Sequence, residues 1–151
     1  MKAFAELCVA SNFSFLRGAS HGDELVVTAK ALGLSAIGIA DRNTLAGVVR
    51  AHVAAKEHGI RLLVGARLVT MDGLEIITYP QDRAAYARLA KLLTLGNRRA
   101  TKGQCHLALG DIMEAGEGQC FIAMPSARSD AAFSEALRQL AEAHPRSVWL
   151  A

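Results

Sequence analysis

Cysteine is scarce in this chain: there are three among 151 residues, and none belongs to a Cys-x-x-Cys pair. An odd number of thiols without paired spacing argues against a disulfide framework of the kind that stabilises small secreted proteins. We therefore expect reduced and mostly buried thiols at Cys8, Cys105 and Cys120. For Cys8 the expected role is that of a small packed side chain.

Long apolar runs are also absent, although 52% of the residues are hydrophobic. No uncharged stretch approaches the roughly 20 residues that a membrane helix needs. Glu6 interrupts the N-terminal segment, which excludes a signal peptide. We expect a cytoplasmic protein with no membrane partner. With 21% charged residues, the composition is typical of one soluble globular domain over residues 1–151.

Neither sign of charge dominates, because seventeen basic and fourteen acidic side chains give a net charge of +3. So small an excess does not by itself indicate a polyanionic partner. The segment 97–103 nevertheless has three positive charges and no negative one. Arg98, Arg99 and Lys102 are therefore candidates for contacts with phosphate or DNA, and a solvated loop is the alternative.

Motifs for nucleotide binding and hydrolysis are missing. No Gly-x-Gly-x-x-Gly follows an expected strand, no P-loop is present, and no serine stands in a Gly-x-Ser-x-Gly turn. His52 and His58 are six residues apart, about 120° around a helix, so they do not converge on a metal. Valines surround His52 in the sequence, and we expect a partly buried core histidine there.

Strand and helix patterns alternate along the chain. This alternation predicts right-handed βαβ crossovers and a mostly parallel α/β sheet, open or closed into a barrel. Functional residues are then expected at the C-terminal ends of the strands. The last expected strand coincides with the end of the sequence, so we expect a piece of a longer protein. The expected strands are 5–10, 36–40, 61–69, 74–79, 119–123 and 147–151, and the expected helices are 22–32, 45–58, 82–95, 109–115 and 129–144.

Asp41 directly follows one of these strands. A carboxylate at the C-terminal end of a parallel strand lies where α/β proteins build their sites. The alternative is an Asx-turn or a helix cap before Asn43 and Thr44. The residue types alone do not choose between the two roles.

Several segments resemble, in order, the N-terminal PHP (polymerase and histidinol phosphatase) domain of bacterial C-family DNA polymerases. The strings SNFSFLRGASH at 11–21 and LLTLGNRRATKG at 92–103 are most similar to the error-prone paralogue of the replicative α subunit. The likeness is specific over 4–103 and general beyond. The other segments that carry it are 4–7, 39–49, 59–67 and 79–86.

The resemblance implies a PHP-type distorted (β/α)7 barrel, incomplete at its C-terminus in this chain. In active members of the family, two or three metal ions at the C-terminal strand ends hydrolyse phosphoesters, and carboxylates and imidazoles hold these ions. The family's His-x-His motif falls on Cys8 and Ala10, its Asp-His pair on Asp41 and Arg42, and its next glutamate on Arg67.

Because two imidazoles are absent and two arginines replace ligands, we expect no bound metal and no phosphoesterase activity. At an effective dielectric constant near 20, each unit repulsion between a metal charge and a guanidinium at 4 Å is on the order of 4 kcal/mol. We expect Asp41 to pair with Arg42 or Arg67 instead. The domain would then support the polymerase core, with the remainder of the α subunit as partner and DNA as a further candidate.

Two alternatives remain at this point. The first is an active phosphoesterase that binds Mn, Zn or Fe through Glu6, Cys8 and Asp41. The second is a phosphate-binding module in which Arg42 and Arg67 grip the anion.

Overall fold

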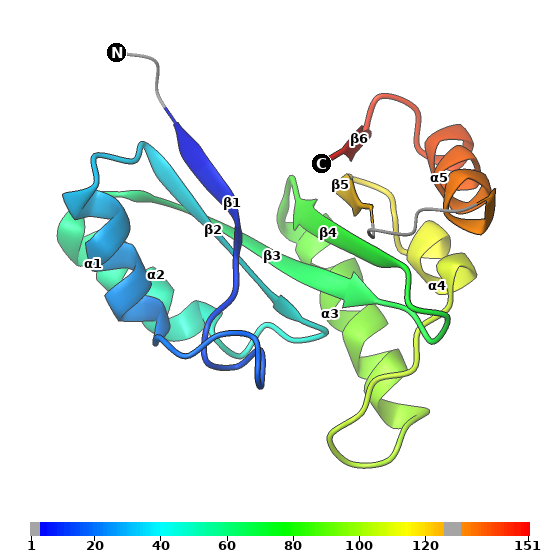
Figure 1. Cartoon of the computed structure of the whole chain (residues 1–151), viewed down its shortest axis with the longest axis horizontal. Coiled ribbons are helices and arrows are strands. Elements are labelled where there is room, and N and C mark those ends of the chain that lie inside the picture. Colours follow the sequence, from blue (N-terminus) through cyan, green and yellow to red (C-terminus); the bar gives the residue numbers. More distant parts are fainter. Residues whose placement is uncertain (1–3, 126–130) are drawn as a thin grey trace. The chain divides into compact units, whose positions relative to one another are not determined.

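The computed structural model describes residues 4–125 and 131–151, which fall into two compact units (Figure 1). The first unit extends to Arg67 and the second runs from Leu68 to Ala151. None of the helices in the described ranges combines the length and the apolar character that crossing a membrane requires.

The first unit consists of strands that alternate with helices: β1 (Ala5–Val9), α1 (Gly22–Ala31), β2 (Ala36–Arg42), α2 (Val48–His58) and β3 (Arg61–Val69), within which the unit ends. Both β1 and β3 pair in parallel with β2. The two connections therefore confirm the predicted βαβ crossovers. Gly59 caps the C-terminus of α2, and its φ of 61° is the left-handed conformation that glycine adopts without a steric penalty.

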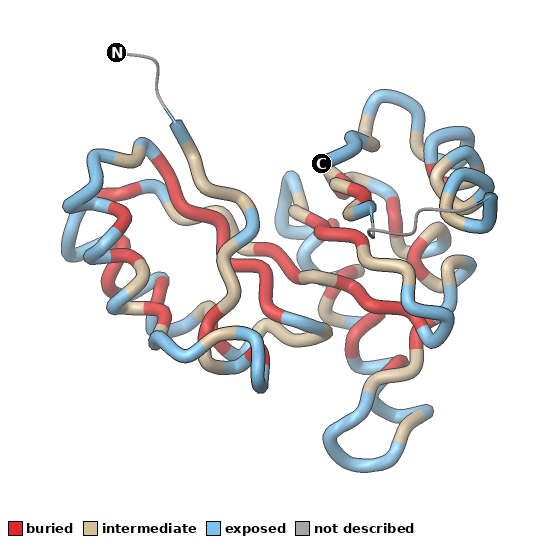
Figure 2. Tube along the Cα trace, viewed as in Figure 1, coloured by how far each residue is buried: buried red, intermediate tan, exposed pale blue. Residues whose placement is uncertain are grey.

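The core of this unit lies between the helices and β2, which is buried along most of its length (Figure 2). Small side chains allow α1 and α2 to approach closely: a Cβ added at Gly22 would lie 3.0 Å from the Cβ of Ala51. The buried residues of this core are Val26, Ala29, Ile37, Ile39, Ala51, Ala54, Ala55 and Ile60.

The second unit has a mixed arrangement. Its elements are β4 (Glu75–Pro80), α3 (Arg83–Arg98), α4 (Leu109–Glu114), β5 (Gln119–Met124), α5 (Ala131–Ala143) and β6 (Val148–Leu150). Strand β5 pairs antiparallel with β4 and parallel with β6. Asp82 begins α3 by accepting a hydrogen bond from the Ala85 N–H at 2.7 Å. The helix then buries Ala85, Leu89, Leu92, Leu93 and Gly96.

Some expected boundaries and burials are wrong. Helix α3 continues to Arg98, so the start of the basic segment is helical. The expected helix start at Ser129 lies outside the described residues, and α5 is described from Ala131. His52 is exposed rather than buried, because α2 turns its alanines toward the core.

The three cysteines are free thiols, but they are less buried than expected. Cys8 is exposed, and Cys105 and Cys120 are half-buried. For Cys8 the cause is a bulge: three residue steps from Glu6 to Val9 in β1 match two steps in β2. The bulge interrupts the strict alternation of inward and outward side chains along β1.

Candidate functional site

Asp41 lies near the C-terminal end of β2, and its side chain is buried, with 1% of the residue exposed. Its Oδ1 accepts hydrogen bonds from the Ser11 N–H at 2.7 Å and from the Ser14 hydroxyl at 2.6 Å. Its Oδ2 accepts a third hydrogen bond from the Ser11 hydroxyl at 2.7 Å. The carboxylate thus fastens the segment that follows β1 to the end of β2.

Both serine hydroxyls also accept hydrogen bonds, so each hydroxyl acts both as a donor and as an acceptor. The Ser11 hydroxyl accepts from the Phe13 N–H at 3.2 Å, and the Ser14 hydroxyl accepts from the Arg42 N–H at 3.0 Å. Ser11 and Ser14 are as deeply buried as Asp41. Because each buried polar group has a partner, the cluster avoids the cost of unsatisfied donors and acceptors. We call Ser11, Ser14 and Asp41 the serine–aspartate cluster.

Glycines close the space around this cluster. A Cβ at Gly47 would lie 2.4 Å from Asp41 Oδ2 and 2.5 Å from the Ser11 hydroxyl oxygen. A Cβ at Gly18 would lie 2.2 Å from the Ser11 carbonyl oxygen. Gly47 has a φ of −73°, so it is the lack of room, and not backbone conformation, that requires glycine there. The protein's own atoms therefore fill the space beside the Asp41 carboxylate.

Arg42 and Arg67 are register neighbours on β2 and β3. Paired residues of adjacent parallel strands send their side chains to the same face of the sheet, so the two guanidinium groups leave the same face. Arg42 is exposed and Arg67 half-buried. The chain turns sharply after Arg42, since Asn43 has a φ of 50° and its N–H donates to the Arg67 carbonyl at 2.9 Å.

Cys8 lies at the bulge in β1, where its N–H donates to a carboxylate oxygen of Glu6 at 2.8 Å. Partial burial raises the pKa of the Cys8 thiol, the negative charge of Glu6 raises it further, and the positive charge of Arg67 acts in the opposite direction. The Cys8 thiol therefore ionises less readily than an ordinary cysteine thiol.

The fold thus gathers most of the positions that the sequence singled out. Asp41, Arg42 and Arg67 lie at or near the C-terminal ends of adjacent strands, with Cys8 in β1 and Ala10 just after it. Within residues 4–125 and 131–151, no three His, Cys, Asp or Glu side chains come together as a metal site would require. The sequence reasoning missed the roles of Ser11 and Ser14, for which the Ser-x-x-Ser spacing in a turn-rich segment was the available signal.

The basic segment belongs to the second unit. Arg99 forms an ion pair with Asp111 at 2.8 Å. The pKa of the Asp111 carboxyl is lowered, first by the hydrogen bond from the Ala108 N–H and then by Arg99. Lys102 is exposed in the turn that follows α3. Arg99 is therefore engaged in an ion pair within the protein, and its role as a phosphate contact stays a prediction.

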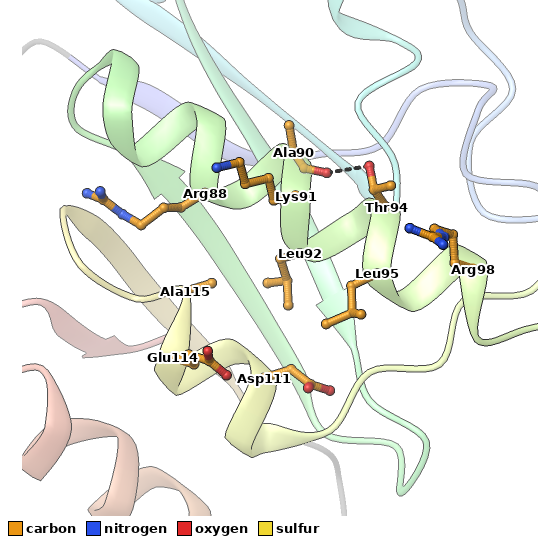
Figure 3. Close-up of a pocket in the computed structure, with 10 residues that line it drawn as sticks. All are labelled: Arg88, Ala90, Lys91, Leu92, Thr94, Leu95, Arg98, Asp111, Glu114 and Ala115. Carbon is orange, nitrogen blue, oxygen red and sulfur yellow. Dashed lines mark hydrogen bonds between the residues drawn. The ribbon is translucent and has the colours of Figure 1, made fainter.

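Arg98 lines a groove of about 610 Å³ between α3 and α4. Figure 3 shows Leu92 and Leu95 pointing from α3 toward α4, with charged side chains along both edges. The α3 edge is basic and the α4 edge is acidic. The charged residues that line the groove are Arg88, Lys91, Arg98, Asp111 and Glu114.

Comparison with known proteins identifies the family to which this chain is similar. The PHP domain family model matches residues 6–143. An error-prone DNA polymerase from Caulobacter vibrioides is 52% identical over 149 residues, which are 98% of this chain and 14% of that protein. One from Brucella abortus is 50% identical over 157 residues, covering 100% of this chain and 15% of that protein. The chain thus spans about one-seventh of the length of these relatives.

Solved structures show the same fold. A proposed metal-dependent phosphoesterase from Bifidobacterium adolescentis has a TM-score of 0.71 at 16% identity, covering 97% of this chain and 76% of that one. An amidohydrolase from Chromobacterium violaceum, with bound sulfate and no metal, has a TM-score of 0.67 at 17% identity with the same coverage. These likenesses confirm the predicted PHP-type α/β fold. The family model matches most of the chain, so the chain belongs to the PHP domain family, and about half of its residues are identical to those of error-prone DNA polymerases.

Proposed function

We propose that this chain is the PHP domain of an error-prone DNA polymerase, that its phosphoesterase site is inactive and binds no metal, and that the domain supports the polymerase core. The observation that carries the proposal is the hydrogen bonding of Asp41, which is the one ligand retained among the family positions that align with Cys8, Ala10, Asp41, Arg42 and Arg67. Its carboxylate already accepts three hydrogen bonds from Ser11 and Ser14. It therefore holds the loop that follows β1 against the end of β2.

The residues around Asp41 do not fit a divalent cation. A binuclear centre brings about four positive charges, and it needs anionic or imidazole ligands to offset them. Arg42 and Arg67 stand at two of the family's ligand positions, where they supply positive charge in place of an imidazole and a carboxylate. Each unit repulsion at 4 Å is on the order of 4 kcal/mol at an effective dielectric constant of 20. One carboxylate that is already hydrogen-bonded does not offset repulsions of that size.

A phosphatase assay tests the inactive site. The purified chain is incubated with p-nitrophenyl phosphate and Mn²⁺, Zn²⁺ or Fe²⁺, beside a variant in which the family's ligands are restored by Cys8→His, Ala10→His, Arg42→His and Arg67→Glu. We expect no metal-dependent turnover by the unmodified chain. Turnover that needs metal and disappears in Asp41→Asn would contradict the proposal and favour an active phosphoesterase that uses Glu6, Cys8 and Asp41.

A second candidate function is phosphate binding by Arg42 and Arg67. The register pairing of these residues favours it. Arginine pairs well with phosphate oxygens because its planar fork donates two parallel hydrogen bonds. A bound phosphate would raise the melting temperature with increasing concentration. Arg67→Ala should abolish that shift, and a shift that persists would exclude this site.

A domain that supports the polymerase core contacts the remainder of the polymerase polypeptide. The relatives are about seven times as long as this chain, so most of such a protein lies outside the matched region. Replacing the matched region of the Caulobacter vibrioides polymerase by this chain tests the role. We expect the chimaera to fold and to extend primers. A chimaera that is insoluble or inactive would contradict the assignment.

A further inference from the structure

The loop that follows β1 has a fixed conformation. Within it the Ser14 N–H donates to the Ser11 carbonyl, and the N–H groups of Arg17 and Gly18 both donate to the Ser14 carbonyl, at 2.9–3.0 Å. Ser11 and Ser14 are anchored to Asp41, and Gly18 packs directly on the Ser11 backbone. Buried hydrogen bonds thus hold the base of this loop at several points.

The apex of the same loop is apolar and projects into solvent. The exposed fractions are 45% for Phe13, 83% for Phe15 and 89% for Leu16. Leu16 also has a φ of 61°, a left-handed conformation that is unfavourable for a residue with a Cβ. Phe15 and Leu16 are thus carried by an anchored loop and make little contact within the chain. The backbone of Leu16 is also strained. Contiguous exposed apolar residues of this kind mark interaction surfaces.

We propose that Phe13, Phe15 and Leu16 form a docking knob that inserts into an apolar pocket of the polymerase region of the same polypeptide. This inference rests on the proposed function. The relatives are about seven times as long as the matched region, so they contain ample chain to cover the knob. A rigid loop loses little conformational freedom on docking, which favours binding by preformed shape. Large apolar anchors in a central pocket dominate the energetics of such interfaces.

The test uses the full-length chimaera, in which this chain replaces the matched region of the Caulobacter vibrioides polymerase. A photo-reactive benzoylphenylalanine at position 15 reports the neighbour of the knob by mass spectrometry. We expect cross-links to polymerase residues of the same polypeptide. We also expect Phe15→Ser with Leu16→Ser to lower the melting temperature of the chimaera, but not that of the 151-residue chain, where both side chains are exposed.

The matched control is Val49→Ser with Val53→Ser, which removes two exposed apolar side chains from α2. It should leave the chimaera unchanged. Cross-links to primer–template DNA, cross-links to a second copy, or none at all would overturn the knob proposal. Equal melting of the Phe15→Ser/Leu16→Ser chimaera and the unmodified chimaera would do the same. Failure of the proposed function is distinguishable, because in that case the unmodified chimaera itself would not fold or polymerise.

Discussion

Replacing Ser14 by alanine should destabilise the protein far more than the loss of one surface hydroxyl. The Ser14 hydroxyl donates to Asp41 at 2.6 Å and accepts from the Arg42 N–H at 3.0 Å. A hydrogen bond to a charged group contributes about 1.5–3 kcal/mol, and a buried N–H left without its acceptor costs about 1–3 kcal/mol. Since neighbouring terms do not add fully, we expect Ser14→Ala to lower the free energy of unfolding by about 3 kcal/mol.

Urea denaturation followed by circular dichroism measures this loss as a lower midpoint at an unchanged slope. Ser20→Ala is the matched control, because Ser20 belongs to the same loop and is exposed. A surface change of this kind stays within about 0.5 kcal/mol. If Ser14→Ala and Ser20→Ala unfold at the same urea concentration, the serine–aspartate cluster does not stabilise the fold as described.

Three further predictions concern packing, thiol chemistry and the basic segment. Gly47→Ala should destabilise the chain by about 1–3 kcal/mol, because its Cβ would overlap Asp41 and Ser11, whereas Gly110→Ala, with open space around it, should not. Arg67→Ala should slow Cys8 alkylation near pH 8.5, because losing a positive charge raises the thiol pKa further and leaves less thiolate. Arg98→Glu should weaken any DNA binding. It should also reduce the slope of log K against log salt concentration by about one, the value expected for one lost phosphate contact.

Each of these predictions has a direct check. Urea midpoints compare the two glycine variants, and equal loss in both would point to a general intolerance of alanine instead of a clash at Gly47. Alkylation rates across pH, measured with the other two cysteines replaced by serine, would contradict the electrostatic account of Cys8 if Arg67→Ala reacted faster. Fluorescence anisotropy at several salt concentrations would assign Arg98 to packing if the slope did not change.

The sequence predicted the elements that have a clear apolar period. In α3, an aspartate cap and a leucine stripe agree with each other, so helix type and buried face were both predictable. The prediction of a partly buried His52 in α2 was wrong, because the buried face of this helix consists of alanines while Val49 and Val53 are exposed. Hydrophobicity alone assigns the larger apolar side chains to the core, but the close approach of α1 and α2 selects the smaller ones.

The candidate site was predictable as a set of positions, but its internal bonding was not. Strand ends and family resemblance located Asp41, Arg42 and Arg67. The hydrogen bonds from Ser11 and Ser14 to Asp41 join residues 27 to 30 positions apart. Such contacts depend on tertiary folding, and serine is common in turns for purely local reasons. The pairing of Asp41 with Arg42 or Arg67 stays a prediction.

The absence of a metal centre beside Asp41 is the central claim. Crystals of the purified chain grown with excess Mn²⁺ test it through anomalous scattering near the manganese absorption edge. We predict no anomalous peak within coordination distance of Asp41, whose oxygens should still accept from Ser11 and Ser14. One or two strong peaks bound by Asp41, with those serines displaced, would contradict the account.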